Sequence, residues 1–303
     1  MKTENETAVT DRVNSYSRYK EIFNLKLIFP GDSKIRAENG SLHIKVERKN
    51  KEVKTDILEE LTSNIKNSRP DSVLVSGGID SSVLAAIAIR EFKNVKLISA
   101  GTENGEDLNF AEILSRELAT PLIRVNIDEE GVYRAINGLK TLGIDTYNTI
   151  MGITEFLSIE KAVELGCRRI ISGIGSDELF FGFYKHKKMD REKLREFRDE
   201  RLFYMPAFDL WRLNSIAVKF GISMIFPYLT DNVIDIALSG GVEFSESNDK
   251  VLLRSAGKRL GLSKTITERN KKAMQYGSGV VKLLRDLSRK KEYKNVGEFI
   301  KGI

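Results

Sequence analysis

The feature that most constrains this chain is a regular alternation of strand-like and helix-like segments between residues 72 and 172. Short apolar runs rich in valine and isoleucine, typical of buried parallel strands, occupy residues 72–76, 95–100, 121–127 and 168–172. Segments with apolar residues at helical spacing lie between them, at residues 81–92, 108–119, 131–142 and 153–166. This alternation predicts an α/β fold with a parallel sheet covered by helices on both faces.

The segments before this region follow other patterns. Residues 55–67 have apolar positions at helical spacing, with Thr55 or Asp56 as the N-cap. Asn39-Gly40 stands among polar and alternating residues, which predicts a β-hairpin within residues 36–52. Residues 25–29 are strand-like.

The strand signals stop after Tyr184, and the rest of the chain is predicted to be helical. We therefore predict three parts: an N-terminal extension over residues 1–52, an α/β core over residues 53–188 and a helical half over residues 189–303.

The composition narrows the chemistry that the chain can perform. A single cysteine, Cys167, excludes a disulfide within the sequence and is predicted to be a buried packing residue. With only His43 and His186 as further ligands, the sequence argues against a zinc cluster and against Ser-His catalysis. The longest apolar run, residues 83–89, is too short to span a membrane, so we expect a soluble cytoplasmic protein.

The strongest local signal is the run SGGIDSS at residues 76–82, between a predicted strand and a predicted helix. Glycines let the backbone approach a ligand closely, and the helix N-terminus and serine hydroxyls can cradle phosphate oxygens. Asp80 suits this setting if it holds Mg²⁺ against the phosphates. The alternative is a glycine turn with a serine N-cap and no ligand. No lysine follows the glycines, so the run is not a Walker A loop.

The run resembles the PP-loop, SGGxDS, of the ATP pyrophosphatase superfamily. Enzymes of that superfamily grip the β,γ-pyrophosphate of ATP while a substrate oxygen attacks the α-phosphorus. A second run, SGIGSDELFFGFY at residues 172–184, resembles the SGxG[S/A]DELFxG motif of the synthetase domain of asparagine synthetase. By itself this second run could be a plain strand-to-helix turn.

The resemblance extends along residues 55–290. It includes PYL after Phe226, the K-x-x-LR pattern at residues 250–254 and the R-x-K-x-x-M-Q pattern at residues 269–275. The last of these is most similar to the divergent asparagine synthetase domain-containing branch. The resemblance implies an ATP-dependent ligase with a PP-loop α/β fold.

The resemblance also implies a role for each matching position. Pyrophosphate and Mg²⁺ would be held by Ser76, Gly77, Gly78, Asp80, Ser81 and Ser82. The adenine or ribose would be bordered by Ser99 and Ala100, and the nucleotide pocket would be lined by Ser172 and Gly173. Asp177 would be a second Mg²⁺ ligand, opposite Asp80, and Lys271 would neutralise charge that develops on the triphosphate.

Several positions depart from the family pattern. Lys2 stands where glutamine-using members have a catalytic cysteine, so ammonia is expected from solution or from a separate glutaminase subunit. Ile174 replaces the glutamate of the second motif, and Thr230 replaces an aspartate further on. The family's arginine near residues 150–151 is absent. The nucleotide half of the site thus matches the family, while the half for the acyl group and amine differs.

These features predict a ligase that adenylates aspartate or a related carboxylate and transfers ammonia, releasing AMP and pyrophosphate. Two alternatives stay open. One is a tRNA-modifying PP-loop enzyme, which the net charge of +6 favours and the single cysteine opposes. The other is a nucleotide-binding homologue without catalysis. The basic run RKKEYK at residues 289–294 is predicted to be a solvated helix face, with RNA contact as its alternative. A homodimer also stays open.

Overall fold

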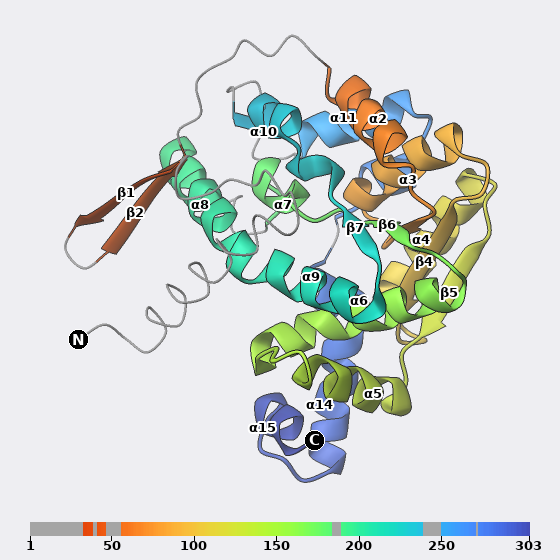
Figure 1. Ribbon diagram of the computed structural model, residues 1–303, viewed down its shortest axis with the longest axis vertical. Helices are drawn as coiled ribbons and strands as arrows, with labels where there is room; N and C mark the ends of the chain where they lie inside the picture. Colours follow the sequence, from red (N-terminus) through yellow and green to blue (C-terminus); the bar gives the residue numbers. More distant parts are fainter. Residues whose placement is uncertain (1–32, 39–40, 47–55, 184–188, 239–249, 271) are drawn as a thin grey trace. The chain divides into compact units, whose positions relative to one another are not determined.

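The computed structural model describes residues 33–38, 41–46, 56–183, 189–238, 250–270 and 272–303 (Figure 1). The chain divides into two compact units that are interleaved in sequence. One, the sheet unit, comprises Leu61–Gly173, Arg212–Pro227 and Leu253–Ile303. The other, the second unit, comprises Met1–Glu60, Ile174–Trp211 and Tyr228–Leu252. The boundaries predicted at residues 52 and 188 stay a prediction.

The sheet unit is built on a five-stranded sheet in the order β5-β4-β3-β6-β7. The strands are β3 (Ser72–Leu74), β4 (Lys96–Gly101), β5 (Leu122–Asn126), β6 (Arg169–Ile171) and β7 (Ser223–Ile225). All four pairings are parallel, and Val73 of the central strand pairs with Leu97 on one side and Ile171 on the other. The parallel sheet that the sequence predicts is therefore confirmed.

The prediction that strands end at Tyr184 is wrong, because β7 joins the sheet beside β6. The strand has three residues and pairs on one side only. A segment so short shows no period-two alternation, and its place at the edge depends on pairing with β6 rather than on its own sequence. Ser172 N then donates to Ile225 O at 3.0 Å, which ties the end of β6 to this edge strand.

Helices connect and flank the strands, as predicted (Figure 1). Those between the strands are α3 (Ile79–Glu91), α4 (Glu106–Glu117), α5 (Glu129–Lys140) and α6 (Thr146–Glu164). The first of them is buried along almost its whole length, so it lies in the core. The last begins seven residues before the predicted residue 153, because Asp145 caps it: its carboxylate accepts from Asn148 N at 3.1 Å. Cys167, which follows, is buried as predicted.

The remaining helices of the sheet unit come late in the chain. They are α12 (Lys264–Thr267), α13 (Met274–Gly277), α14 (Val280–Lys290) and α15 (Val296–Gly302), preceded by α9 (Asp209–Phe220) and α11 (Val251–Arg259), which each begin in the second unit. The pair α14 and α15 packs against α6 (Figure 1). Among the described residues, no helix is long and apolar enough to cross a membrane.

The second unit contains a hairpin and several helices. The hairpin of β1 (Ser33–Glu38) and β2 (Ser41–Val46) pairs antiparallel from Ser33 and Val46 to Glu38 and Ser41, which confirms the predicted hairpin. Its helical elements are α7 (Ser176–Leu179), α8 (Arg191–Tyr204), η3 (Met205–Ala207), η4 (Pro227–Leu229) and α10 (Asp231–Leu238), of which η4 begins in the sheet unit.

The helix α2 (Ile57–Ser68) runs from the second unit into the sheet unit. The carboxylate of Asp56 accepts from Leu58 N at 2.9 Å, so Asp56 caps the predicted helix, and Thr55, the other predicted cap, lies outside the described residues. The strand-like residues 25–29 lie outside the described residues.

Candidate active site

The run at residues 76–82 begins in the loop that joins β3 to α3 and ends in the first turn of α3. Gly77 has a left-handed φ of +67°, which favours glycine. A β-carbon at that position would also lie 2.7 Å from Ala111 N and even closer to Phe110, so only glycine fits there. The loop is thus held tightly against the first half of α4.

The serines of the loop are partly engaged by its own backbone. Ser76 N donates to Ser81 Oγ at 3.1 Å, and Ser81 Oγ donates to Gly78 O at 3.2 Å. Ser82 Oγ donates to the same carbonyl at 2.8 Å, and Ser82 is fully buried. The hydroxyl of Ser82 therefore shapes the loop, and its predicted role in holding pyrophosphate stays a prediction.

The carboxylate of Asp80 lies in the first turn of α3, where the helix dipole favours negative charge. Asp80 is 4% exposed. A carboxylate oxygen with neighbouring hydroxyls is a donor set that Mg²⁺ accepts, and Mg²⁺ uses one or two carboxylates together with substrate phosphates. Asp80 fits such an ion. Within the described part of the chain, no group of three His, Cys, Asp or Glu residues is placed to bind a metal by itself.

The other predicted nucleotide-binding residues lie at the carboxyl ends of the neighbouring strands. Ser99 and Ala100 lie on β4, both buried, and Ser172 and Gly173 follow β6 directly. A β-carbon on Gly173 would lie 3.5 Å from Asp80 Cβ, so the two predicted loops meet. The strands β3 and β6 continue to opposite sides of the sheet, and such a switch point is where open α/β sheets bind ligands.

A buried arginine that sequence reasoning gave no role holds this edge together. Arg269 donates to Ser76 O at 2.7 Å and to Asp107 Oδ1 at 2.7 Å. Its guanidinium lies 3.8 Å from the centre of the Phe110 ring, and the side chains of Arg269 and Asp107 are each 3% exposed. Arg269 stands in the pattern quoted at residues 269–275, but only the fold reveals that it pairs with Asp107.

A second arginine supports the first. Arg254 on α11 donates to the carbonyl oxygens of Thr267 and Arg269, which fixes the backbone after α12. Lys272, further along the same segment, pairs with Glu106 at 3.1 Å. Lys271, the predicted catalytic lysine, lies outside the described residues.

Asp177, the second predicted Mg²⁺ ligand, belongs to the second unit and is described there. Its Oδ1 is 2.5 Å from Lys250 Nζ, and Lys250 is 6% exposed on its side chain. The carboxylate of Asp177 is thus neutralised by an ammonium group in this structure. Its predicted role as a metal ligand stays a prediction.

The neighbouring Glu178 is a strongly perturbed acid. Its pKa is raised to about 8, chiefly by burial and then by the charge of Asp177, with a smaller upward contribution from Asp209 and a downward one from Arg201. Arg201 Nη2 is 3.5 Å from Glu178 Oε1 and equally far from Asp209. Glu178 therefore keeps its proton at neutral pH.

Comparison with known proteins finds a matching family model and several similar sequences. Residues 55–203 match the asparagine synthase family model. A relative in Methanocaldococcus jannaschii, named as a glutamine-hydrolysing asparagine synthetase, is 29% identical over 272 residues, which is 75% of this chain and 50% of that protein. Asparagine synthetase B of Escherichia coli is 27% identical over 62% of this chain and 37% of that protein. The chain thus spans half or less of these relatives.

Among solved structures, an NH3-dependent NAD synthetase from Campylobacter jejuni aligns at a TM-score of 0.40 with 17% identity, covering 81% of this chain and 91% of that one.

Proposed function

Residues 55–203 match the asparagine synthase family model, and from this match we propose that the protein is an ATP-dependent ligase that joins a carboxylate to ammonia. The proposed acyl substrate is aspartate or a related carboxylate. One substrate oxygen attacks the α-phosphorus of ATP, which forms an acyl-adenylate and releases pyrophosphate. Ammonia then attacks the acyl carbon, which forms the amide and releases AMP.

The observation that carries the proposal is the meeting of two predicted loops at the switch point of the sheet. The loop at residues 76–82 and the residues Ser172 and Gly173 lie at the carboxyl ends of adjacent strands. Backbone N–H groups at the start of α3 suit the phosphates of ATP, and Ser172 and Gly173 suit the other side of the nucleotide. In this arrangement the site holds ATP by the β,γ-pyrophosphate.

The role that we propose for each residue follows from the chemistry of its side chain. Bound Mg²⁺ would offset charge on the departing pyrophosphate, and Asp80 is the residue proposed to hold it, with Asp177 as the second proposed ligand. Lys271 is proposed to stabilise the charge that builds on the triphosphate, as an ammonium group does at a phosphoryl centre. Arg269 acts through the loop, by holding Ser76 O and the first turn of α4.

The half of the site that takes the acyl group is where the family pattern is broken. Ile174 cannot accept a proton or a hydrogen bond, unlike the glutamate of the family motif. We infer that adenylation is retained and that acyl or amine selection is altered. Ammonia from solution or from a separate glutaminase subunit is the proposed nitrogen source.

The test is exchange of labelled pyrophosphate into ATP, with aspartate as the first carboxylate tried. Exchange that depends on the carboxylate reports reversible adenylation without requiring the amine. Aspartate labelled with ¹⁸O in the side-chain carboxylate should then transfer one labelled oxygen to AMP when ammonium is added. Asparagine is measured in the same reaction.

Two variants sharpen the assay. Asp80→Asn should abolish exchange, while Glu164→Gln, which removes an exposed carboxylate paired with Lys161, should leave it unchanged. Ile174→Glu should raise asparagine formation if that position alone shifts substrate choice. If the protein binds ATP but none of the carboxylates tried supports pyrophosphate exchange, the proposed ligase activity is refuted.

A further inference from the structure

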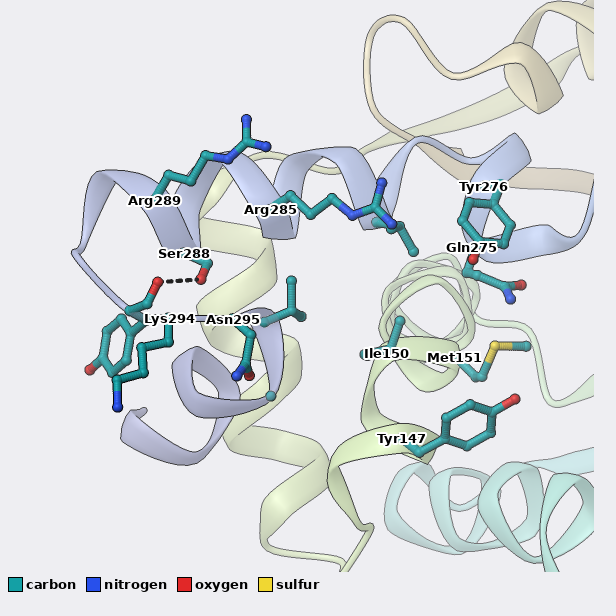
Figure 2. Close-up of a pocket in the computed structure, with 14 residues that line it drawn as sticks. Tyr147, Ile150, Met151, Gln275, Tyr276, Arg285, Ser288, Arg289, Lys294 and Asn295 are labelled. Carbon is teal, nitrogen blue, oxygen red and sulfur yellow. Dashed lines mark hydrogen bonds between the residues drawn. The ribbon is translucent and has the colours of Figure 1, made fainter.

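A groove in the sheet unit lies beside α14 (Figure 2), and none of the residues that line it belongs to the run at residues 76–82. Its volume is about 550 Å³, which is large enough for more than one small ligand group. One wall comes from the start of α6, another from α13, and the long side from α14 and the turn into α15 (Figure 2).

The groove is electrostatically one-sided. Arg285, Arg289 and Lys294 line it, all three are exposed, and none of its described lining residues is an Asp or Glu. Within the part of the chain that the structure describes, no carboxylate forms an ion pair with the side chains of these three, while Glu298 Oε2 accepts from the backbone N of Lys294 at 3.3 Å. The neighbouring Lys290 behaves differently, because it pairs with Glu129 of α5 at 3.0 Å. The cations of the groove thus lie along its length, with Arg285 and Arg289 on α14 and Lys294 in the turn that follows it.

Two exposed tyrosine rings also line the groove. Tyr147 is 70% exposed and Tyr276 is 56% exposed, whereas most large apolar side chains of the described residues are covered. In Figure 2 the ring of Tyr276 lies beside Gln275, and the ring of Tyr147 lies at the same end of the groove, beyond Met151. Exposed rings beside arginines are a surface on which nucleobases stack, because every base offers a flat face of the same kind.

The amide of Gln275 lies in the same wall. Its Oε1 is buried and has no hydrogen-bond partner among the described residues. A buried polar atom without a partner costs free energy unless something else satisfies it, so the wall has unused hydrogen-bonding capacity.

The walls are fixed by the fold rather than by the groove residues themselves. Ser278 O, directly after α13, accepts from Thr102 N at 2.8 Å, which ties this wall to the end of β4. Leu284 and Leu287 are buried on the inner side of α14. Arg285 and Arg289 are four residues apart, so they lie about 6 Å apart along the helix axis and present two charges in a row.

We propose that this groove binds single-stranded nucleic acid, with phosphates on Arg285, Arg289 and Lys294 and bases against Tyr147 and Tyr276. The cations supply sequence-independent attraction to the phosphates, and the two rings supply the stacking. An acidic protein segment would satisfy the cations but would leave two exposed rings unused. The proposal is independent of the ligase activity, because it names none of the residues proposed to act on ATP.

The experiment measures fluorescence anisotropy of a labelled 12-nucleotide single-stranded RNA of mixed sequence, and of DNA of the same sequence, against the full chain at several salt concentrations. We expect binding whose affinity falls with salt. The double variant Arg285→Gln/Arg289→Gln should weaken it and reduce the salt slope by about 1.4, at about 0.7 for each phosphate of a single strand that is no longer neutralised. Tyr147→Ala should weaken binding by about 5- to 150-fold because the stacking on its ring is removed.

The matched control is Arg116→Gln/Lys258→Gln, which removes the same charge from exposed positions outside the groove and should leave the slope near that of the wild-type protein. No binding of either strand at 50 mM salt would overturn the proposal. The proposal would also be overturned if the two double variants weakened nucleic-acid binding equally. The same holds if polyglutamate at a matched charge concentration displaced the nucleic acid and Tyr147→Ala left the affinity unchanged. Pyrophosphate exchange is measured on the same groove variants and should be unchanged, so a failure of nucleic-acid binding can be told apart from a failure of the proposed ligase activity.

Discussion

The buried acid Glu178 makes a pH-dependent contribution to stability whose sign can be worked out from its surroundings. In the folded protein its pKa is raised from 4.5 to about 8, chiefly by burial and then by the charge of Asp177. Between these two values the folded protein holds a proton that the unfolded chain has lost. The contribution is therefore fully present below about pH 4.5 and is lost as pH rises through 8.

The magnitude follows from the shift. At about 1.4 kcal/mol per pKa unit, the free energy of unfolding should fall by about 4 kcal/mol between pH 5 and pH 9 because of this group. Glu178→Gln imitates the protonated acid and should remove most of that fall. Trp211, the single tryptophan, belongs to the same unit as Glu178, so urea unfolding followed by its fluorescence reports on the right region.

The comparison needs a variant in which a different carboxylate is removed. Glu164 is half-exposed and pairs with Lys161 at 2.7 Å, so Glu164→Gln should keep the pH profile of the wild-type protein. If the profile of Glu178→Gln instead runs parallel to that of the wild-type protein between pH 5 and pH 9, Glu178 is not the buried acid that its surroundings indicate.

Three further changes test the frame of the candidate site. Gly77→Ala should destabilise the protein by more than about 1 kcal/mol, since it adds left-handed strain and a clash beside Phe110, and equilibrium dialysis should show lost ATP binding. Arg269→Met should cost about 3–5 kcal/mol in urea unfolding, because it removes one partner of the buried pair that Arg269 forms with Asp107; a cost under about 1 kcal/mol would contradict this. Asp145→Ala should cost about 1 kcal/mol by removing the cap of α6, as differential scanning calorimetry can measure.

The sequence predicts those parts of the fold that depend on local pattern. The four strands between residues 72 and 172 follow from short apolar runs, and the hairpin follows from Asn39-Gly40 and its flanking alternation. The strand β7 does not follow, because three residues carry no period and the pairing partner lies far away in sequence. The early start of α6 depends on its cap, because the Asp145 carboxylate that accepts from Asn148 N fixes where the helix begins.

The candidate site shows the same division. The loop at residues 76–82 is recognisable from spacing, since the glycines and serines that shape it are close in sequence. The pair of Arg269 and Asp107 is separated by 162 residues, so no local pattern could reveal it. A charge run such as residues 289–294 was predicted to be solvated, and Arg289, Lys290 and Lys291 are indeed exposed. Only packing shows that Arg289 faces a groove while Lys290 pairs with Glu129.

The first turn of α4 holds the segment around residues 269–277 against the sheet unit. Asp107 sits where the helix dipole favours a carboxylate, and Arg269 adds an ion pair to that position. Gly277 lies against the same carboxylate, because a β-carbon there would be 2.5 Å from Asp107 Oδ1. Lys272 pairs with Glu106 in the same turn. Residues on both sides of Lys271 thus contact one turn of one helix, and that turn follows the strand that carries Ser99, so its position is set by the sheet.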